Sequence, residues 1–127
     1  MNKKYLMPVA IILLIILIAV AAAKPKIEAN FQDLKNLTFS EIDLAKTKDG
    51  TYAGSHKAFP ITAEVMVTVK NHVITDIEIT KHDTGKGKAG ESIIGKVLEK
   101  QSLQVDAISG ATYSSNVILK AIENALD

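Results

Sequence analysis

The side chains best suited to chemistry lie together near the end of the chain, in the stretch Asp106-Ala107-Ile108-Ser109-Gly110-Ala111-Thr112-Tyr113-Ser114-Ser115. Ser109 and Thr112 carry hydroxyl groups on either side of Gly110 and Ala111, which add almost no side-chain bulk. A ligand or another protein can therefore approach the backbone closely at this point. Thr112 presents the most accessible hydroxyl of the stretch.

A helix is predicted directly after these hydroxyls. Apolar residues recur there three and four positions apart, which places them on one helical face: Val117, Ile118, Ala121, Ile122, Ala125 and Leu126. The hydroxyls then lie at the N-terminus of the helix, where unpaired N–H groups and about half a positive charge favour a phosphate group. Ser, Thr and Asp are also common helix caps, so a turn without any ligand is the alternative interpretation.

The order of residues from Asp106 to Thr112 resembles the flavinylation motif of FMN-binding domains. This family includes subunits of the sodium-translocating NADH:quinone reductases and their Rnf relatives. Its motif ends in a Thr that carries FMN through a phosphoester bond, so the resemblance implies that Thr112 is the attachment point. It also implies further cofactor-binding positions, namely Asp106, Ser109, Gly110, Ala111 and Ser114. Asp106 either takes part in recognition of the motif or positions the turn.

A second candidate segment is the glycine-rich loop of residues 81–90, which carries His82, Asp83 and Thr84. The family usually has Glu-Thr-Pro-Gly here and packs this loop near the flavin, so the resemblance implies that Asp83 and Thr84 bind the cofactor. The proline is missing and lysines are added, and a solvated loop without a ligand is the alternative. No second His or Cys has suitable spacing to share a metal ion with His82, so no metal site is predicted.

The chain begins with an apolar segment. Residues 6–23 carry no charge, and lysines flank them on both sides. At about 1.5 Å per residue this segment reaches roughly 27 Å, enough to cross a hydrocarbon core. We predict a signal anchor over residues 1–23, with a cleaved signal peptide as the alternative. A signal anchor and a cleaved signal peptide both deliver the rest of the chain to the extracytoplasmic side. That part consists of a polar tether over residues 24–48 and a domain over residues 49–127.

Composition narrows the possible functions further. A chain of 127 residues leaves room for one small domain after the apolar segment. Its 15 basic residues are all lysines, and without Lys3 and Lys4 the remaining 13 face 14 acidic residues, a net charge of −1. Nucleic-acid binding is therefore not expected, since it needs a clustered basic surface. The chain has no cysteine for a disulfide or a thiolate metal site.

Strands are predicted in the middle of the chain. The turn signal Asp49-Gly50 leads into a first strand from Thr51 to about Lys57. Apolar and polar residues then alternate over residues 61–70. The alternation resumes after Asn71-His72, with Val73, Ile77 and Ile79 as the apolar residues of the inner face. This period predicts an antiparallel hairpin that forms one wall of the core.

Helical spacing appears on the C-terminal side of this hairpin. A helix is expected over residues 91–100, whereas residues 24–48 show at most one or two helical turns. The elements together predict an α+β domain, a small antiparallel sheet with helices packed on one side. The resemblance to FMN-binding domains covers residues 49–126, nearly the whole of this domain.

The apolar segment predicts export and a membrane tether, and the resemblance to FMN-binding domains implies an electron carrier with FMN fixed at Thr112. The flavin supplies the redox chemistry, so no catalytic base or nucleophile is required of the domain. The implied partners are membrane-linked electron donor and acceptor proteins, and a flavin transferase that uses FAD and a divalent metal. Two alternatives stay open. One is a flavin-dependent reductase of a small extracytoplasmic substrate, with His82 as proton donor. The other is a flavin-free, membrane-tethered binding module.

Overall fold

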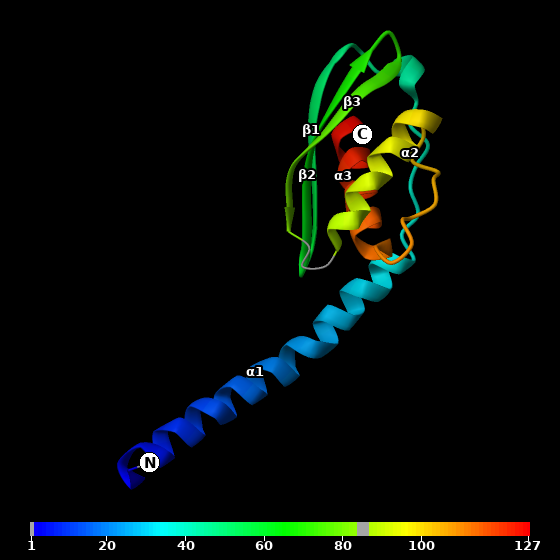
Figure 1. The fold of residues 1–127 in the computed structure, drawn as a ribbon. Helices are drawn as coiled ribbons and strands as arrows, with labels where there is room; N and C mark the ends of the chain where they lie inside the picture. Colours follow the sequence, from blue (N-terminus) through cyan, green and yellow to red (C-terminus); the bar gives the residue numbers. More distant parts are fainter. Residues whose placement is uncertain (1, 84–86) are drawn as a thin grey trace.

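The computed structural model describes residues 2–83 and 87–127 of the chain. Figure 1 shows that the first helix projects away from a layer of strands covered by the remaining helices. In chain order the elements are helix α1 (Lys3–Lys35), the 3-10 turn η1 (Leu44–Lys46), strands β1 (Gly50–Ala58), β2 (Ile61–Lys70) and β3 (Val73–Asp83), the 3-10 segment η2 (Gly87–Ser92), and helices α2 (Ile93–Lys100) and α3 (Thr112–Leu126).

The three strands form one antiparallel sheet in the order β1-β2-β3. The central strand β2 alternates as predicted, and its inward residues are all buried: Ile61, Ala63, Val65, Val67 and Val69. Each fully buried Val or Ile contributes roughly 1.5–3 kcal/mol. This face of β2 is therefore the main wall of the hydrophobic core.

The predicted turn between β2 and β3 lies at Asn71 and His72, which have φ angles of 53° and 64°. Positive φ at both central residues is the pattern of a type I′ turn, whose twist matches that of the strands it joins. His72 is not free in this position, because its Nδ1 donates a 2.9 Å hydrogen bond to the Leu44 carbonyl oxygen.

One predicted core position in β3 was wrong. Val73 is 45% exposed, and Ile74 takes the core position with 2% exposure. The register between β2 and β3 shifts at Thr68/Val69. Such an irregularity changes which residues face the core, and a strict period of two cannot anticipate it.

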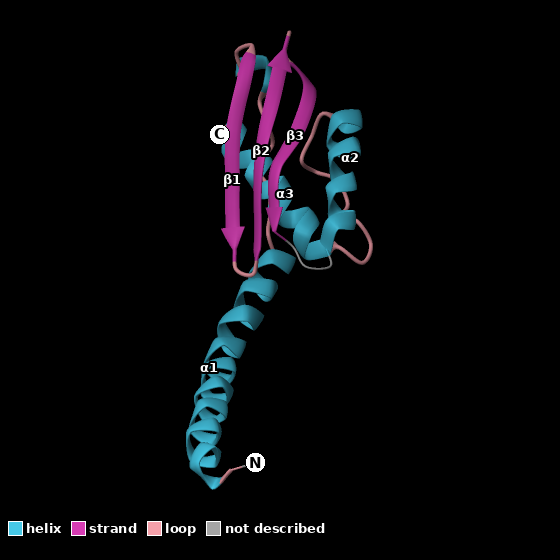
Figure 2. Ribbon diagram, turned by 60° about the vertical axis from the view of Figure 1, so that its left-hand side comes forward, coloured by secondary structure: helices cyan, strands magenta, loops and turns pink. Residues whose placement is uncertain are grey.

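The helices that follow the sheet pack on its inner face, as Figure 2 shows. Helix α3 lies against β1 and β2, and α2 lies beside β3. A Cβ atom on Gly54 would lie 2.1 Å from the Ala121 carbonyl oxygen, so only glycine allows this approach of α3 to β1. The predicted α+β domain, with helices on one side of an antiparallel sheet, is confirmed. The helix expected over residues 91–100 begins as η2 and becomes α-helical at Ile93.

Helix α1 contains the predicted apolar segment. Its residues Lys3–Ala22 form a 20-residue stretch with a mean hydropathy of 2.9, none of it buried in the structure. Such a stretch is long and apolar enough to cross a membrane, and an N-terminal signal sequence would look the same. The helix continues to Lys35, which is further than the one or two helical turns expected after residue 23.

The segment between α1 and β1 packs against the domain. Its apolar residues are partly buried against the core: Leu37, Phe39, Ile42 and Leu44. Gln104 Nε2 donates to the Phe39 carbonyl oxygen at 2.6 Å, and the Ser40 N–H donates to Glu123 Oε2 at 3.0 Å. The domain boundaries after residues 23 and 48 stay predictions, but residues 37–44 are in contact with the folded domain.

Candidate functional site

The hydroxyl-rich stretch lies at the end of the domain that α1 enters. In Figure 1 the first turn of α3 (orange) is beside the end of α1 (cyan), and the two helices are in contact. Thr112 is the first residue of α3 and is exposed. The apolar period of residues 117–126 therefore placed Thr112 correctly at a helix N-terminus.

A tight turn of residues 108–111 precedes Thr112. The Ala111 N–H donates to the Ile108 carbonyl oxygen at 2.9 Å, and Gly110 has a φ of 80°. This is the pattern of a type II turn, which favours glycine at its third position. A Cβ atom on Gly110 would meet nothing within 4 Å, so a larger side chain would fit there. Glycine is favoured because of the positive φ angle. Ser109, at the second position, is exposed.

Ser115 holds this turn against the helix. Its hydroxyl accepts a hydrogen bond from the Ile108 N–H at 3.0 Å and donates one to the Ala111 carbonyl oxygen at 2.7 Å. The side chain is completely buried. Ser115 was not among the predicted site residues, although its position four residues after Ala111 on the buried stripe of α3 was a signal for it. It fixes both ends of the turn that presents Thr112.

Thr112 lies between two hollows in the surface. The larger has a volume of about 510 Å³, and Thr112 and Asn116 of α3 form one side of it. Residues 103–107 and the segment after α1 form the other sides, with Lys35, Leu37, Thr38 and Phe39. The smaller hollow, of about 250 Å³, is lined by Lys35, Gly110, Thr112 and Tyr113. Ligand clefts in proteins measure about 300–1,000 Å³, so the larger hollow has room for a small cofactor.

The charges around Thr112 favour an anion. The first turn of α3 contains no acidic residue, so no carboxylate opposes the positive end of the helix dipole there. Among the described residues that line the two hollows, Lys35 is the only cation and Asp106 the only carboxylate. Asp106 is exposed, and its backbone carbonyl oxygen accepts a 3.1 Å hydrogen bond from Lys96 Nζ. Lys96 thus holds the main chain of the motif while the carboxylate stays at the surface.

Ser114 lines neither hollow and is 2% exposed. A Cβ atom on Gly90 would lie 2.9 Å from Ser114 Cβ and 3.1 Å from the Ser115 N atom, so η2 packs directly on the first turn of α3. The lack of a side chain at Gly90 makes this contact possible. A role for Ser114 in cofactor binding stays a prediction, and its side chain packs close to Gly90 of η2.

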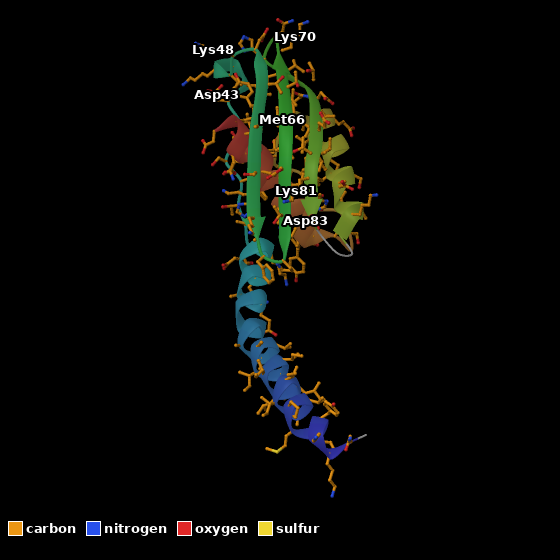
Figure 3. All side chains as sticks on the ribbon, turned by 90° about the vertical axis from the view of Figure 1, so that its left-hand side faces the viewer. Asp43, Lys48, Met66, Lys70, Lys81 and Asp83 are labelled. Carbon is orange, nitrogen blue, oxygen red and sulfur yellow. The ribbon has the colours of Figure 1, made fainter. Side chains whose placement is uncertain are left out.

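The loop of residues 81–90 therefore returns to the first turn of α3 through η2. Asp83, the last residue of β3, is exposed, and its Oδ2 lies 3.7 Å from Lys81 Nζ (Figure 3). Thr84 lies outside the described residues. The structure brings Asp106, Gly110 and Thr112 together around the hollows, and Asp83 does not line either of them.

A bulge in β3 turns His82 toward the inside of the domain. The register shifts between Glu64 and Val65, and Thr80 is the extra residue, with its Oγ1 donating to the Glu64 carbonyl oxygen at 3.1 Å. His82 is consequently paired with the buried Ala63 and faces the core, because a bulge redirects the side chains that follow it. Its side chain is 4% exposed.

The imidazole of His82 is held close to one carboxylate. Its Nδ1 lies 3.8 Å from Glu91 Oε1, and neither ring nitrogen has a hydrogen-bond partner among the described residues. Burial lowers the pKa of His82 below its ordinary value, while Glu91 and Asp83 act in the opposite direction. Within the described part of the chain, no group of three His, Cys, Asp or Glu residues is arranged to hold a metal ion.

Comparison with known proteins identifies the family. A sequence model described as the FMN-binding domain matches residues 59–127, which is more than half of the chain. This chain belongs to the FMN-binding domain family. The match includes β2, β3 and the entire motif around Thr112, so the resemblance noted from the sequence is confirmed, and the cofactor is FMN.

A curated relative is the NADH:acrylate oxidoreductase of Vibrio harveyi. It is 33% identical over 85 residues, which make up 65% of this chain but 8% of that protein. This FMN-binding domain protein therefore spans less than a tenth of the relative's length. The activity in that name is a property of a much larger protein.

The residues around Thr112 fit FMN. An exposed hydroxyl at a helix N-terminus, the open space beside Gly110 and the nearby Lys35 suit a phosphate group. The larger hollow adds the apolar side chains of Leu37, Phe39 and Val105, which suit a flat ring system.

Proposed function

We propose that this protein is an extracytoplasmic, membrane-tethered electron carrier that holds FMN covalently through a phosphoester bond to Thr112. The observation that carries the proposal is the position of Thr112. Thr112 is exposed at the first position of α3, after a turn fixed by Ser115, and it lines two hollows. Bound flavin supplies the capacity to accept and release electrons, and the protein supplies attachment and orientation.

The bond would form by phosphoryl transfer from FAD on a separate flavin transferase. The Thr112 oxygen bonds to the phosphorus atom of the FMN half, the pyrophosphate bond breaks, AMP leaves, and the hydroxyl proton is released. No electrons are exchanged in this step. An exposed hydroxyl at the end of a helix can enter the active site of another enzyme, whereas the fully buried hydroxyl of Ser115 cannot.

Covalent attachment suits a cofactor outside the cytoplasm. A phosphate at the N-terminus of α3 gains about 0.3–1 kcal/mol from the helix dipole. That free energy changes a binding equilibrium only several-fold, because about 1.4 kcal/mol is needed for a factor of ten. The dipole alone would not prevent loss of FMN by dilution, so the ester bond provides retention.

Membrane attachment determines which partners the carrier meets. We infer that α1 crosses the membrane, with Lys3 and Lys4 on the cytoplasmic side and the domain on the other. The helix continues 13 residues from Ala22 to Lys35, or roughly 20 Å at 1.5 Å per residue. Because Thr112 is at the α1 end of the domain, the flavin would face the membrane, which favours membrane-linked electron donors and acceptors.

The Vibrio relative motivates a second candidate function, in which the flavin reduces a small substrate such as acrylate. Direct reduction needs a proton donor at the substrate. The side chain of His82 is 4% exposed and lines neither hollow beside Thr112, so its position does not favour a role as this proton donor. Protein with its flavin reduced under anaerobic conditions separates the two functions. On addition of acrylate, a carrier stays reduced and a reductase is reoxidised.

The covalent bond is tested on denatured protein. Full-length chain produced with a flavin transferase should keep its flavin fluorescence in SDS, and Thr112→Ala should abolish it. Fluorescence that is lost from the wild-type chain on denaturation would contradict the proposed bond.

A further inference from the structure

We propose that Lys35, the last residue of α1, binds the phosphate of the flavin at Thr112. The end of the membrane helix is then part of the cofactor site and not only a spacer. This inference rests on the proposed site at Thr112, but it concerns a residue outside the motif and more than 70 positions before it in the sequence.

The first observation is the position of Lys35. It lines both the 510 Å³ hollow and the 250 Å³ hollow, and Thr112 is the other residue common to both. A group attached to the Thr112 hydroxyl therefore extends into space bounded by Lys35, whichever hollow it enters.

The second observation is that this part of the chain is held in place. Gln104, which lines the larger hollow, donates a 2.6 Å hydrogen bond from Nε2 to the Phe39 carbonyl oxygen. Leu37 and Phe39 are partly buried against the core. The residues directly after Lys35 thus form a fixed wall, which brings the end of α1 to α3.

The third observation is the balance of charge. Lys35 Nζ lies within 4 Å of no carboxylate of the described residues, although Asp106 lines the same hollow. The ammonium group is thus available to an incoming anion. A phosphate between this group and the N-terminus of α3 meets positive charge from two elements that are far apart in the sequence.

A lysine in the last turn of a helix also interacts favourably with the dipole of its own helix. That purely structural role would not distinguish one flavin from another. A role in phosphate binding would distinguish FMN from riboflavin, since riboflavin has the same ring and side chain but no phosphate.

The test compares the affinity of full-length, unflavinylated protein in detergent micelles for FMN and for riboflavin. Wild-type protein should prefer FMN, and Lys35→Gln should reduce this preference by about two- to five-fold, as expected for an exposed ion pair. Lys35→Arg should restore it. Lys70→Gln is the matched control, because Lys70 is an exposed lysine at the opposite end of the domain (Figure 3).

A second measurement covers the loaded protein. In protein flavinylated by the transferase, Lys35→Gln should shift the ³¹P resonance of the phosphodiester, and Lys70→Gln should leave it unchanged. If Lys35→Gln leaves the preference for FMN unaltered, the proposed role of Lys35 is overturned. If unflavinylated protein binds neither flavin, an unaltered ³¹P resonance in Lys35→Gln overturns it instead. A third outcome separates the two proposals. If the protein never acquires covalent flavin but its preference for FMN depends on Lys35, the covalent bond is refuted and the role of Lys35 is supported.

Discussion

The hydroxyl of Ser115 links the Ile108 N–H to the Ala111 carbonyl oxygen, with hydrogen bonds of 3.0 Å and 2.7 Å. A single buried side chain therefore closes the turn from which Thr112 projects. Replacing Ser115 by Ala should lower the free energy of unfolding by about 1–3 kcal/mol, because the partly buried Ile108 N–H loses its partner. Urea unfolding of full-length protein measures this. Ser109→Ala, at an exposed position of the same turn, should change stability by less than about 0.5 kcal/mol. Equal effects of the two substitutions would contradict the role of Ser115.

Two glycines should respond differently to alanine. Gly54→Ala forces a Cβ atom to within 2.1 Å of the Ala121 carbonyl oxygen. It should cost about 3 kcal/mol, the upper end for overpacking in a core. Gly110→Ala meets no neighbouring atom but must hold a φ of 80°, at a cost of about 1 kcal/mol. Gly110→Asn should cost less, since Asn tolerates positive φ better. Chemical denaturation ranks the three variants, and a larger loss for Gly110→Ala than for Gly54→Ala would contradict the packing of α3 on β1.

The burial of His82 should make stability depend on pH. Its pKa is lowered in the folded protein, so the unfolded chain takes up a proton more readily. Neutral His82 therefore contributes to the free energy of unfolding. This contribution is complete above about pH 6.5, and it is lost as the pH falls from there toward the pKa of His82 in the folded protein. Burial and Lys120 lower the pKa of His56 as well, and that effect has the same sign.

His82→Leu removes one of these two titrating groups. Between about pH 7 and about pH 5 its free energy of unfolding should fall less steeply than that of the wild-type protein. Urea titrations at several pH values measure both slopes. Identical slopes would show that His82 titrates in the folded protein as it does in the unfolded chain.

The apolar part of α1 should hold the protein in the membrane. Full-length chain is expected to stay in the membrane fraction after a high-salt wash, because salt screens charge interactions but does not weaken the hydrophobic burial of Lys3–Ala22. Detergent should release it. A mature chain that begins near residue 24 and is recovered in the soluble fraction would show that the segment is a cleaved signal peptide. Export of the domain would still hold in that case.

Local pattern predicted much of this fold. The alternation from Ile61 to Val69 specified β2, and the helical period from Val117 specified α3 and hence the exposed N-terminal position of Thr112. Both depend on a period within one element, which the sequence carries directly.

The features that escaped prediction depend on contacts between distant residues. The bulge at Thr80 turns the side chain of His82 to the inner face of the sheet. A bulge arises from the pairing of two strands, so the sequence of β3 alone does not reveal it. The packing of residues 37–44 depends on bonds such as that from Gln104 to Phe39, 65 positions apart. Lys35 reaches the motif only because this segment is folded back on the domain. Several hydroxyls were visible in the motif, but only the packing of α3 distinguishes the buried Ser115 from the exposed Thr112.

The most direct test of the central claim is the fluorescence of the denatured chain. Full-length protein is produced in an exporting host with and without an active flavin transferase, and its gel band is viewed in SDS before mass spectrometry. The account predicts a fluorescent band carrying one FMN on Thr112, only in the presence of the transferase. The label should disappear in Thr112→Ala, persist in Ser109→Ala and Ser114→Ala, and persist in part in Thr112→Ser, which keeps the hydroxyl. A colourless wild-type band beside a transferase proven active on another substrate, or a label that survives in Thr112→Ala, would contradict the claim.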